Sequence, residues 1–239
     1  MEDVEKASSI TDCSFAGSVS GNIQVGGIVG CVGLHNNVER CSNTAAVTGK
    51  ELIGGIAGAN SYGNIRYCRN TGTVGNDTAK QVGGIVGAHQ NYAELIASYN
   101  TGDVKGADYI GGIAGNVYVA SMPLGCYNVG SVSSGVHCGG AVGSFGGDDY
   151  ITIKKGSFYQ GPLSSAYQAN GAKMRSAEDM KKESFVSELN ADAYVTCYTK
   201  DTQNKNNGYP ILTWEVDGFQ VTFNANGGDC DKPTPHGTS

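Results

Sequence analysis

The sequence is poor in proline and in charged residues, and it has no long apolar run. Its 239 residues include 5 Pro, and Asp, Glu, Lys and Arg together make up 16% of the chain, against roughly 25% in an ordinary soluble domain. The net charge of −6 offers no electrostatic footprint for nucleic acid or for an anionic membrane surface. No apolar stretch reaches the roughly 18 residues that a membrane-spanning helix needs, and residues 1–6 lack the apolar core of a secretion signal. We therefore expect either a cytosolic protein or a piece of something longer.

Leucine and helical periodicity are also scarce, whereas glycine is abundant. Val outnumbers Leu by 21 to 7, and 37 residues are Gly. β-Branched side chains suit a pleated strand better than a helix, and much glycine with little proline indicates many tight turns. The bulk of the chain is predicted to be all-β.

Motifs that carry metal or hydrolytic chemistry are missing as well. The eight cysteines and four histidines show no Cys-x-x-Cys or His-x-x-x-His spacing, so neither a metal site nor a cofactor is predicted. No Gly-x-Ser-x-Gly elbow is present. We expect the histidines to lie solvated on loops or in the tail: His35, His89, His137 and His236.

A block of two glycines, two apolar residues and a third glycine recurs about every 28 residues. The block begins at Gly26, Gly54, Gly83, Gly111 and Gly139. A second block reads Cys-x-Asn-x-Gly-x-Val in its fullest copies and is anchored at Cys41, Cys68, Ser98 and Cys126, with degenerate copies at Cys13 and Ser157. Tandem copies without helices indicate a structural turn rather than a phosphate-binding loop.

Apolar positions alternate within each unit, which predicts short β-strands. A unit of this length has room for three strands and cannot bury its own apolar face. We therefore expect the units to stack, each winding once around an axis, with parallel strand pairing between turns about 4.8 Å apart. The predicted fold is a parallel β-helix, or β-solenoid, over residues 1–159.

Stacking would place equivalent residues in columns. One column of small, weakly polar side chains is predicted to point inward: Cys13, Cys41, Cys68 and Cys126. Free thiols are favoured there, because parallel side chains give poor disulfide torsion angles. A second column has amides that can hydrogen-bond to the copies above and below: Asn43, Asn70, Asn100 and Asn128.

The repeated Gly-Gly-Ile-Val-Gly and Gly-Gly-Ile-Ala-Gly blocks, followed by Cys-x-Asn-Thr-Gly-x-Val, resemble the GLUG motif. This motif occurs in large bacterial surface and secreted proteins, including regions that precede some immunoglobulin A metallopeptidases. The resemblance implies an architecture and a bacterial cell-surface or extracellular location, but no shared reaction. Residues 219–228 resemble the opening strand of a Listeria–Bacteroides repeat, which implies that the chain is a monomeric fragment of a larger multidomain protein.

The period ends near residue 160, and a different element is expected to follow. An N-cap signature at Ser176 predicts a helix over about 176–190, and residues 209–216 predict a final strand that contains Trp214 as a packing residue. A Met-Lys-Lys helix followed by Asn-x-Gly-Tyr-Pro-Ile-Leu-x-Trp resembles segments that close GLUG regions. We assign residues 160–217 as a cap over the open last coil, and residues 218–239 as the truncated first strand of a following surface repeat with a disordered tail.

Aromatic residues supply the candidate ligand-binding positions. Tyr99, Tyr127 and Phe158 follow the column anchors, so alternation points them outward in a stripe that could stack on sugars or knit the coils together. Loops after each glycine block vary in length and share one edge, where recognition is expected. The candidate ligand-binding residues are Tyr62, Tyr92, Tyr99, Tyr118, Tyr127 and Tyr150.

These features favour a non-enzymatic structural or adhesion module of an exported bacterial surface protein, whose loops bind a glycan or a host or microbial surface protein. The alternative is a carbohydrate-active β-helix enzyme, a polysaccharide lyase or glycosidase, whose carboxylates must converge on one coil face. The best candidates for that role are Asp103, Asp108, Asp148 and Asp149. Their spacing favours solvated surface positions instead.

Overall fold

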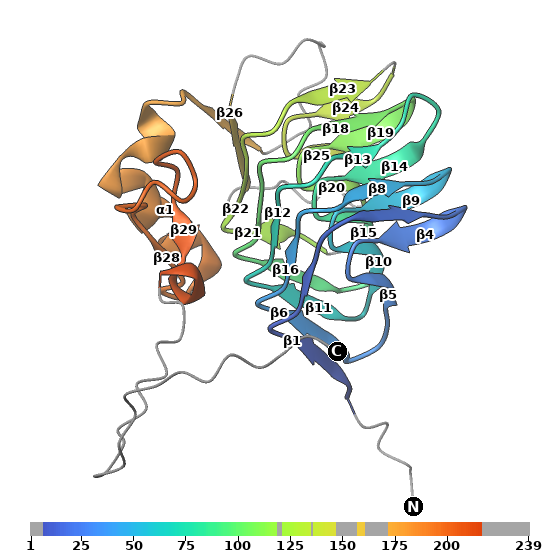
Figure 1. The fold of residues 1–239 in the computed structure, drawn as a ribbon, viewed down its shortest axis with the longest axis horizontal. Coiled ribbons are helices and arrows are strands. Elements are labelled where there is room, and N and C mark those ends of the chain that lie inside the picture. The colour runs from blue at the N-terminus through green and yellow to red at the C-terminus, as the bar shows by residue number, and fades with distance from the viewer. Residues whose placement is uncertain (1–6, 119–120, 135, 147–156, 161–171, 217–239) are drawn as a thin grey trace, which may run out of the picture.

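The computed structural model describes residues 7–118, 121–134, 136–146, 157–160 and 172–216. The chain winds through about five coils of about 28 residues each, which confirms the predicted β-solenoid (Figure 1). Each coil contributes one short strand to each of five parallel sheets, named A to E in chain order, rather than three longer strands. Equivalent residues of successive coils are paired in register, as Ile10, Val38, Ile65, Leu95 and Pro123 are in sheet A.

The strands of each sheet come from successive coils. Sheet A contains β1 (Ser9–Thr11), β6 (Asn37–Glu39), β11 (Asn64–Arg66), β16 (Glu94–Ile96) and β21 (Pro123–Leu124). Sheet B contains β2 (Ser14–Phe15), β7 (Ser42–Asn43), β12 (Arg69–Asn70), β17 (Tyr99–Asn100), β22 (Cys126–Asn128), β26 (Ser157–Gln160) and β27 (Lys173–Arg175). Sheet C contains β3 (Ser18–Ser20), β8 (Ala46–Thr48), β13 (Val74–Gly75), β18 (Val104–Gly106) and β23 (Val132–Ser134). Sheet D contains β4 (Ile23–Gly26), β9 (Glu51–Gly54), β14 (Lys80–Gly83), β19 (Asp108–Gly111) and β24 (Cys138–Gly139). Sheet E contains β5 (Val29–Val32), β10 (Ala57–Ser61), β15 (Val86–Gln90), β20 (Ala114–Tyr118) and β25 (Val142–Gly146).

The cap follows the solenoid and contains little regular structure. It comprises the 3-10 helix η1 (Asp179–Lys181), the helix α1 (Glu183–Ala193), the antiparallel strands β28 (Tyr198–Thr199) and β29 (Ile211–Leu212), and the 3-10 helix η2 (Thr213–Glu215). Within the described ranges, no helix has the length and apolar character needed to cross a membrane.

The glycine block brings sheets D and E into backbone contact. A Cβ added at Gly58 would lie 2.4 Å from the carbonyl carbon of Gln24, and one at Gly87 would lie 2.4 Å from the amide nitrogen of Ile53. Only glycine permits this approach, and the contact divides the interior into two cores. The core between sheets A and E includes Ile56, Ile65, Ile85, Leu95 and Ile113. The core between sheets C and D includes Val47, Ile53, Val82, Val104 and Ile110.

The predicted asparagine column forms a continuous buried ladder. Nδ2 of Asn43 donates to Oδ1 of Asn70 at 2.7 Å, and the same bond links Asn70 to Asn100 (2.7 Å) and Asn100 to Asn128 (2.8 Å). Each amide also donates to the carbonyl of the residue two positions later, as Asn100 does to Gly102 at 2.7 Å. The buried amides are therefore satisfied by their own repeats, which removes most of the cost of burying a polar group.

The second glycine of each block leaves room for these amides. A Cβ on Gly55 would lie 2.4 Å from Cγ of Asn70 and 2.2 Å from the carbonyl oxygen of Gly84. The same relation recurs in the neighbouring coils. The two sequence blocks, although separated along the chain, are thus one packing unit.

Three corners of the coil use a left-handed residue, usually not glycine, in most of the coils that the structure describes. One set lies two residues before the glycine block: Gln24, Leu52, Gln81 and Tyr109, with φ between 53° and 58°. A second set directly precedes the column anchors: Asp12, Arg40, Tyr67, Ala97 and, in the fifth coil, Gly125. The third set joins sheets E and A: His35, Tyr62, Asn91 and Tyr92. This conformation costs an ordinary residue roughly 1–2 kcal/mol, so the stacked coils must hold it in place.

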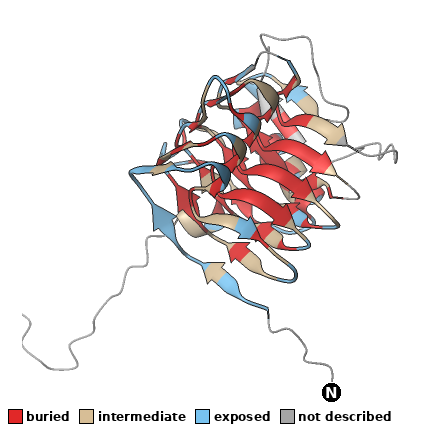
Figure 2. Ribbon diagram, turned by 90° about the vertical axis from the view of Figure 1, so that its right-hand side faces the viewer, coloured by how far each residue is buried: buried red, intermediate tan, exposed pale blue. Residues whose placement is uncertain are grey.

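The cysteine column lies on the inner side of the coils, and its first member is uncovered at the open end of the solenoid. Cys41, Cys68 and Cys126 are fully buried, whereas Cys13 is exposed because no coil covers the first one (Figure 2). Sγ of Cys13 nevertheless lies 3.3 Å from the carbonyl oxygen of Thr11, the same contact with the residue two positions back that the buried members of the column make. The described cysteines carry free thiols.

One histidine lies in the core, contrary to the prediction of solvated loop positions. His89 of β15 is fully buried and pairs in register with Asn60 of β10 and Val117 of β20. Its Nδ1 lies 3.4 Å from Nδ2 of Asn60. Burial lowers the pKa of His89 to about 3, so the imidazole is neutral in the folded chain.

The glycine contact predicts a large effect from one methyl group. Gly55→Ala is expected to lower the free energy of unfolding by roughly 2–3 kcal/mol, because the new Cβ would overlap backbone and amide atoms that cannot withdraw. Gly33→Ala is the matched control, since its Cβ would meet only Nδ2 of Asn36 at 3.7 Å. Urea unfolding followed by far-ultraviolet circular dichroism would measure both, and equal stabilities would contradict the role assigned to the glycine block.

Burial of His89 predicts a specific loss of stability in mild acid. The unfolded chain takes up a proton below about pH 6.5, whereas folded His89 resists protonation until about pH 3. Its contribution to stability is therefore complete above about pH 6.5 and decreases as the pH falls, by up to about 1.4 kcal/mol per pH unit. Chemical unfolding between about pH 4.5 and 6.5 should show this slope in the natural chain and a smaller one in His89→Val, which copies Val117. Equal slopes in the natural chain and in His89→Val would contradict the assignment of this pH dependence to His89.

Candidate functional site

Tyr99 and Tyr127 point out of the coils, as alternation predicts, yet both are fully buried. Their rings stack on each other with centroids 5.0 Å apart and an interplanar angle of 7°. Phe185 of α1 packs edge-on against Tyr127 and Phe158, at 6.0 and 5.1 Å. The prediction that Tyr99 and Tyr127 bind a ligand is therefore wrong, because the cap occupies the face that their rings would offer.

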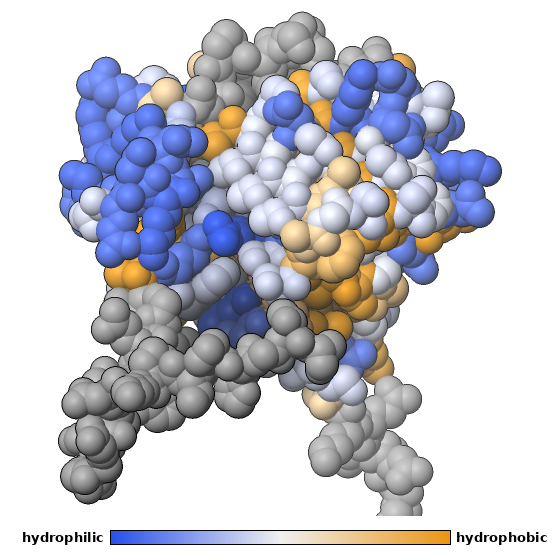
Figure 3. All heavy atoms as spheres, viewed as in Figure 1, coloured by the Kyte–Doolittle hydropathy of each residue, from blue (hydrophilic) through white to orange (hydrophobic). Residues whose placement is uncertain are grey.

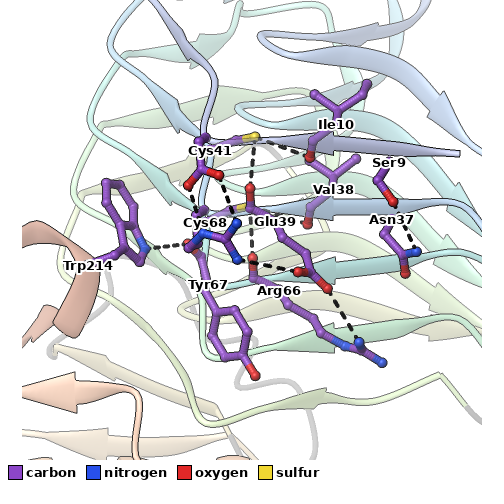
Figure 4. A network of polar contacts seen from close by, with 12 residues as sticks. Ser9, Ile10, Asn37, Val38, Glu39, Cys41, Arg66, Tyr67, Cys68 and Trp214 are labelled. Atoms are coloured by element: carbon purple, nitrogen blue, oxygen red, sulfur yellow. Dashed lines mark hydrogen bonds and ion pairs between the residues drawn. The ribbon is translucent and has the colours of Figure 1, made fainter.

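Polar contacts hold the cap against this stripe. Oη of Tyr99 donates to the Glu215 carboxylate at 2.8 Å, and Nη1 of Arg69 lies 3.2 Å from the same oxygen. Burial raises the pKa of Glu215. Trp214 donates through Nε1 to the carbonyl oxygen of Tyr67 at 2.9 Å (Figure 4), so it has the packing role predicted for it.

The described helices of the cap and its strands β28 and β29 lie along the flank of the solenoid beside sheet B (Figure 1), whereas β27 of the same segment pairs with β26 and extends sheet B by one strand. The aromatic stripe explains this position, because it offers a continuous apolar surface for the buried residues of the cap. Those residues include Met180, Phe185, Val186 and Leu189. The outward face of the cap is mostly hydrophilic (Figure 3).

The cap elements differ in extent from the predicted ones. Ser176 does accept the amide of Asp179 at 3.0 Å, but this bond opens η1. Extended backbone at Lys182 (φ −82°, ψ 152°) then separates η1 from α1, which ends at Ala193 rather than near residue 190. The final strand is limited to β29, and η2 follows it.

The exposed corner between sheets E and A holds the other candidate tyrosines. We call Leu34, His35, Tyr62, Asn91 and Tyr92 the corner ridge. Tyr62 is 48% exposed and Tyr92 is 68% exposed. The amide of His35 donates to the carbonyl of Tyr62 at 3.0 Å, and Nδ2 of Asn91 donates to Oγ of Ser61 at 3.0 Å, so the ridge runs across successive coils.

Tyr118 lies near the same corner but is partly buried, and its hydroxyl contacts Nδ2 of Asn116 at 2.6 Å. Tyr150, Asp148 and Asp149 lie outside the described residues. The ridge is therefore the one exposed group of predicted site residues among those described.

The two described carboxylates among those considered for catalysis are bound to their neighbours. Oδ1 of Asp103 accepts from Oγ of Ser131 at 2.5 Å, and Oδ1 of Asp108 lies 2.7 Å from Nδ1 of His137. Tyr109 stacks on His137 with centroids 4.8 Å apart. In the part of the chain that the structure describes, no group of three or more His, Cys, Asp or Glu side chains could hold a metal ion.

The inward thiols contact backbone carbonyl oxygens. Sγ of Cys41 lies 3.3 Å from the oxygen of Glu39 and 3.6 Å from that of Ile10 (Figure 4). A hydrogen bond with Cys68 lowers the pKa of Cys41 to about 7, whereas burial raises the pKa of Cys126 to about 12. Since Cys41 is fully buried, this column serves packing rather than covalent chemistry.

An open hollow of about 650 Å³ between β27 and α1 was not anticipated from the sequence. Its polar side chains are already paired: Arg175 donates to Glu188 at 2.9 Å, and Ser176 donates to Asp179 at 2.8 Å. Strand β27 falls outside the repeat, so periodicity gives no signal for this surface.

With the coil geometry established, the chain can be compared with known proteins. Residues 49–75 match the GLUG motif. This segment contains the glycine block at Gly54 and the ladder residue Asn70, the two parts of the packing unit described above.

The fold also resembles a solved structure. The crystal structure, at 1.30 Å resolution, of a putative immunoglobulin A1 protease from Bacteroides ovatus matches with a TM-score of 0.60. The match covers 87% of this chain and 70% of that chain, at 19% sequence identity, so the likeness is one of fold. No curated protein matches the sequence.

The cap packs directly against the solenoid backbone at Gly125, where φ is 58°. A Cβ there would lie 2.6 Å from Cβ of Ala193 and 2.7 Å from the carbonyl oxygen of Leu189. Ala97, the equivalent residue of the preceding coil, has φ 47° and carries a methyl group. The left-handed backbone alone therefore tolerates alanine at this corner.

Gly125→Ala is expected to displace α1 from the stripe, because the added methyl overlaps α1. The fluorescence emission of Trp214, the chain's one tryptophan, should shift to longer wavelength as water reaches the contact between the cap and sheet B. The backbone amides of residues 183–193 should exchange hydrogen faster. Gly17→Ala is the control, since Gly17 also has positive φ but its Cβ would meet nothing within 4 Å. An unchanged spectrum in Gly125→Ala would refute close docking at this point.

Proposed function

We propose that the chain is a stiff, non-enzymatic module of an exported bacterial surface protein, which carries the corner ridge toward a glycan or a surface protein of a host or microbe. The observation that carries this proposal is the unbroken register of the five sheets from coil to coil. A module whose equivalent residues are paired at every turn resists bending, as a spacer must. Its repeated Cys, Asn and Gly residues are used for stacking rather than for chemistry.

The comparisons support this proposal at a coarser level. The GLUG match and the likeness to a fold from a Bacteroides protein agree with a bacterial β-helix. Residues 219–228, which lie outside the described ranges, resemble a surface-protein repeat. Together these points favour display on a cell exterior.

Surface display predicts accessibility on intact cells. In a bacterium that carries the parent gene, antibodies raised against residues 1–239 should label unpermeabilised cells, and added protease should remove the label. A cytosolic protein of the same cells is the control for lysis. Label that appears only after permeabilisation would overturn the proposal.

The same proposal predicts that the chain does not cleave polysaccharides. Incubation with pectin, alginate and mucin glycans should release no reducing ends or unsaturated sugars above the level of buffer alone. Asp108→Ala and Asp148→Ala are the informative variants, because they remove carboxylates that a β-helix enzyme would need. Turnover by the natural chain that either substitution abolishes would establish the enzyme instead.

A further inference from the structure

The corner ridge contains three ring side chains whose placement the fold does not explain. His35, Tyr62 and Tyr92 have φ of 59°, 58° and 57°, a conformation that bulky residues rarely adopt. Among the described residues, these side chains have no hydrogen bond, ion pair or ring contact. The left-handed backbone forms the corner between sheets E and A, but the corner does not require aromatic side chains, and exposed apolar surface of this kind is typical of binding sites.

Other tyrosines of the chain have a structural role that these lack. Tyr99 and Tyr127 are covered by the cap, and Tyr109 stacks on His137. Tyr194 is 73% exposed with φ 57°, but it ends α1, and its amide bonds to the carbonyl of Ala191. Left-handed backbone at Tyr194 thus closes a helix, whereas at the ridge no such function accounts for an aromatic residue.

The ridge rings form a row along the solenoid axis. His35, Tyr62 and Tyr92 belong to three successive coils, which are spaced about 4.8 Å apart, so the row is about 10 Å long. Neutral amides flank it on sheet A, where Nδ2 of Asn64 donates to Oδ1 of Asn37 at 2.8 Å. The ridge therefore combines flat apolar faces with neutral hydrogen-bonding groups.

The size and charge of the ridge decide between ligand classes. A stable protein interface needs about 800 Å² on each partner, far more than a single row of rings offers. An anionic ligand would need an available cation, but the nearby Arg66 is already ion-paired with Glu94 and Glu39. A short neutral sugar chain fits both limits, since each pyranose presents a C–H face that packs on the negative face of an aromatic ring.

We propose that the corner ridge binds a neutral oligosaccharide of two or three sugar units, laid along the solenoid axis across Tyr62 and Tyr92. This inference rests on the proposed function and names the ligand class of its exposed edge. The rings supply the stacking surface, and the ridge amide of Asn91, held by its bond to Ser61, supplies polar contacts to sugar hydroxyls.

The test is binding of the whole chain to an array of neutral di- to tetrasaccharides, with sialylated and sulfated forms beside them, followed by calorimetric titration of the best neutral binder. Tyr62→Ala and Tyr92→Ala should each weaken binding roughly tenfold, and the Tyr→Phe versions should stay within about twofold. Tyr194→Ala is the matched control, an exposed left-handed tyrosine away from the ridge, and it should bind like the natural chain. Unchanged circular dichroism would show that the variants are folded.

Binding to no neutral glycan, to charged glycans alone or to a protein alone would overturn the assignment, as would equal affinities of the natural chain and the Tyr62→Ala/Tyr92→Ala double variant. Surface labelling of cells reports separately on the proposed function. If intact cells are labelled but no glycan on the array is bound, the sugar site is rejected and the display role stands. If intact cells are not labelled, the display role is rejected even if sugars bind.

Discussion

The fold depends on how closely two backbones approach across the Gly-Gly-x-x-Gly block. At Gly58 and Gly87 there is no space for a side chain, so sheets D and E touch through their main chains. The adjacent Gly55 faces the amide of Asn70, and this places the asparagine ladder at the junction of the two cores. Coil width, separation of the cores and polar satisfaction of the interior all follow from this contact.

Because the interior is committed to packing, the periphery is the part of the described solenoid that is left for the proposed recognition. The cysteines and asparagines that would suggest chemistry in another fold are consumed by carbonyl and amide bonds inside the coils. The outward-pointing rings of Tyr99 and Tyr127 are also buried, because the cap packs on them. The corner between sheets E and A is different, because exposed aromatic residues there occur on consecutive coils and their rings have no partner among the described residues.

The repeat was sufficient to predict the solenoid, its period, the asparagine ladder and the inward thiols of the inner coils. Periodicity reports which residues become neighbours, and stacking is a neighbour relation. Periodicity does not report the sign of the backbone angle φ. The left-handed corners at Leu52 and Tyr109 carry residue types that do not indicate a positive φ. This is why five short strands per coil replaced three longer ones. Burial by a non-repeating partner was equally invisible, so the cap over Tyr99 could not be read from the chain. The core position of His89 lies within the repeat, in register with Asn60 and Val117, and its polar side chain is what disguised an inward position.

The asparagine ladder also has a direction. Every Nδ2 is aimed at the coil that follows, and the last of them, on Asn128, reaches the carbonyl oxygen of Gly140 at 3.0 Å. At the opposite end Phe15 stands where the next amide would be. Aligned amide dipoles reinforce one another in a low-dielectric interior, so the row from Asn43 to Asn128 is electrically polar along the solenoid axis. A duplicated or transplanted coil can extend the row only if it enters in the same sense, which allows such a protein to lengthen by whole units and forbids insertion in reverse.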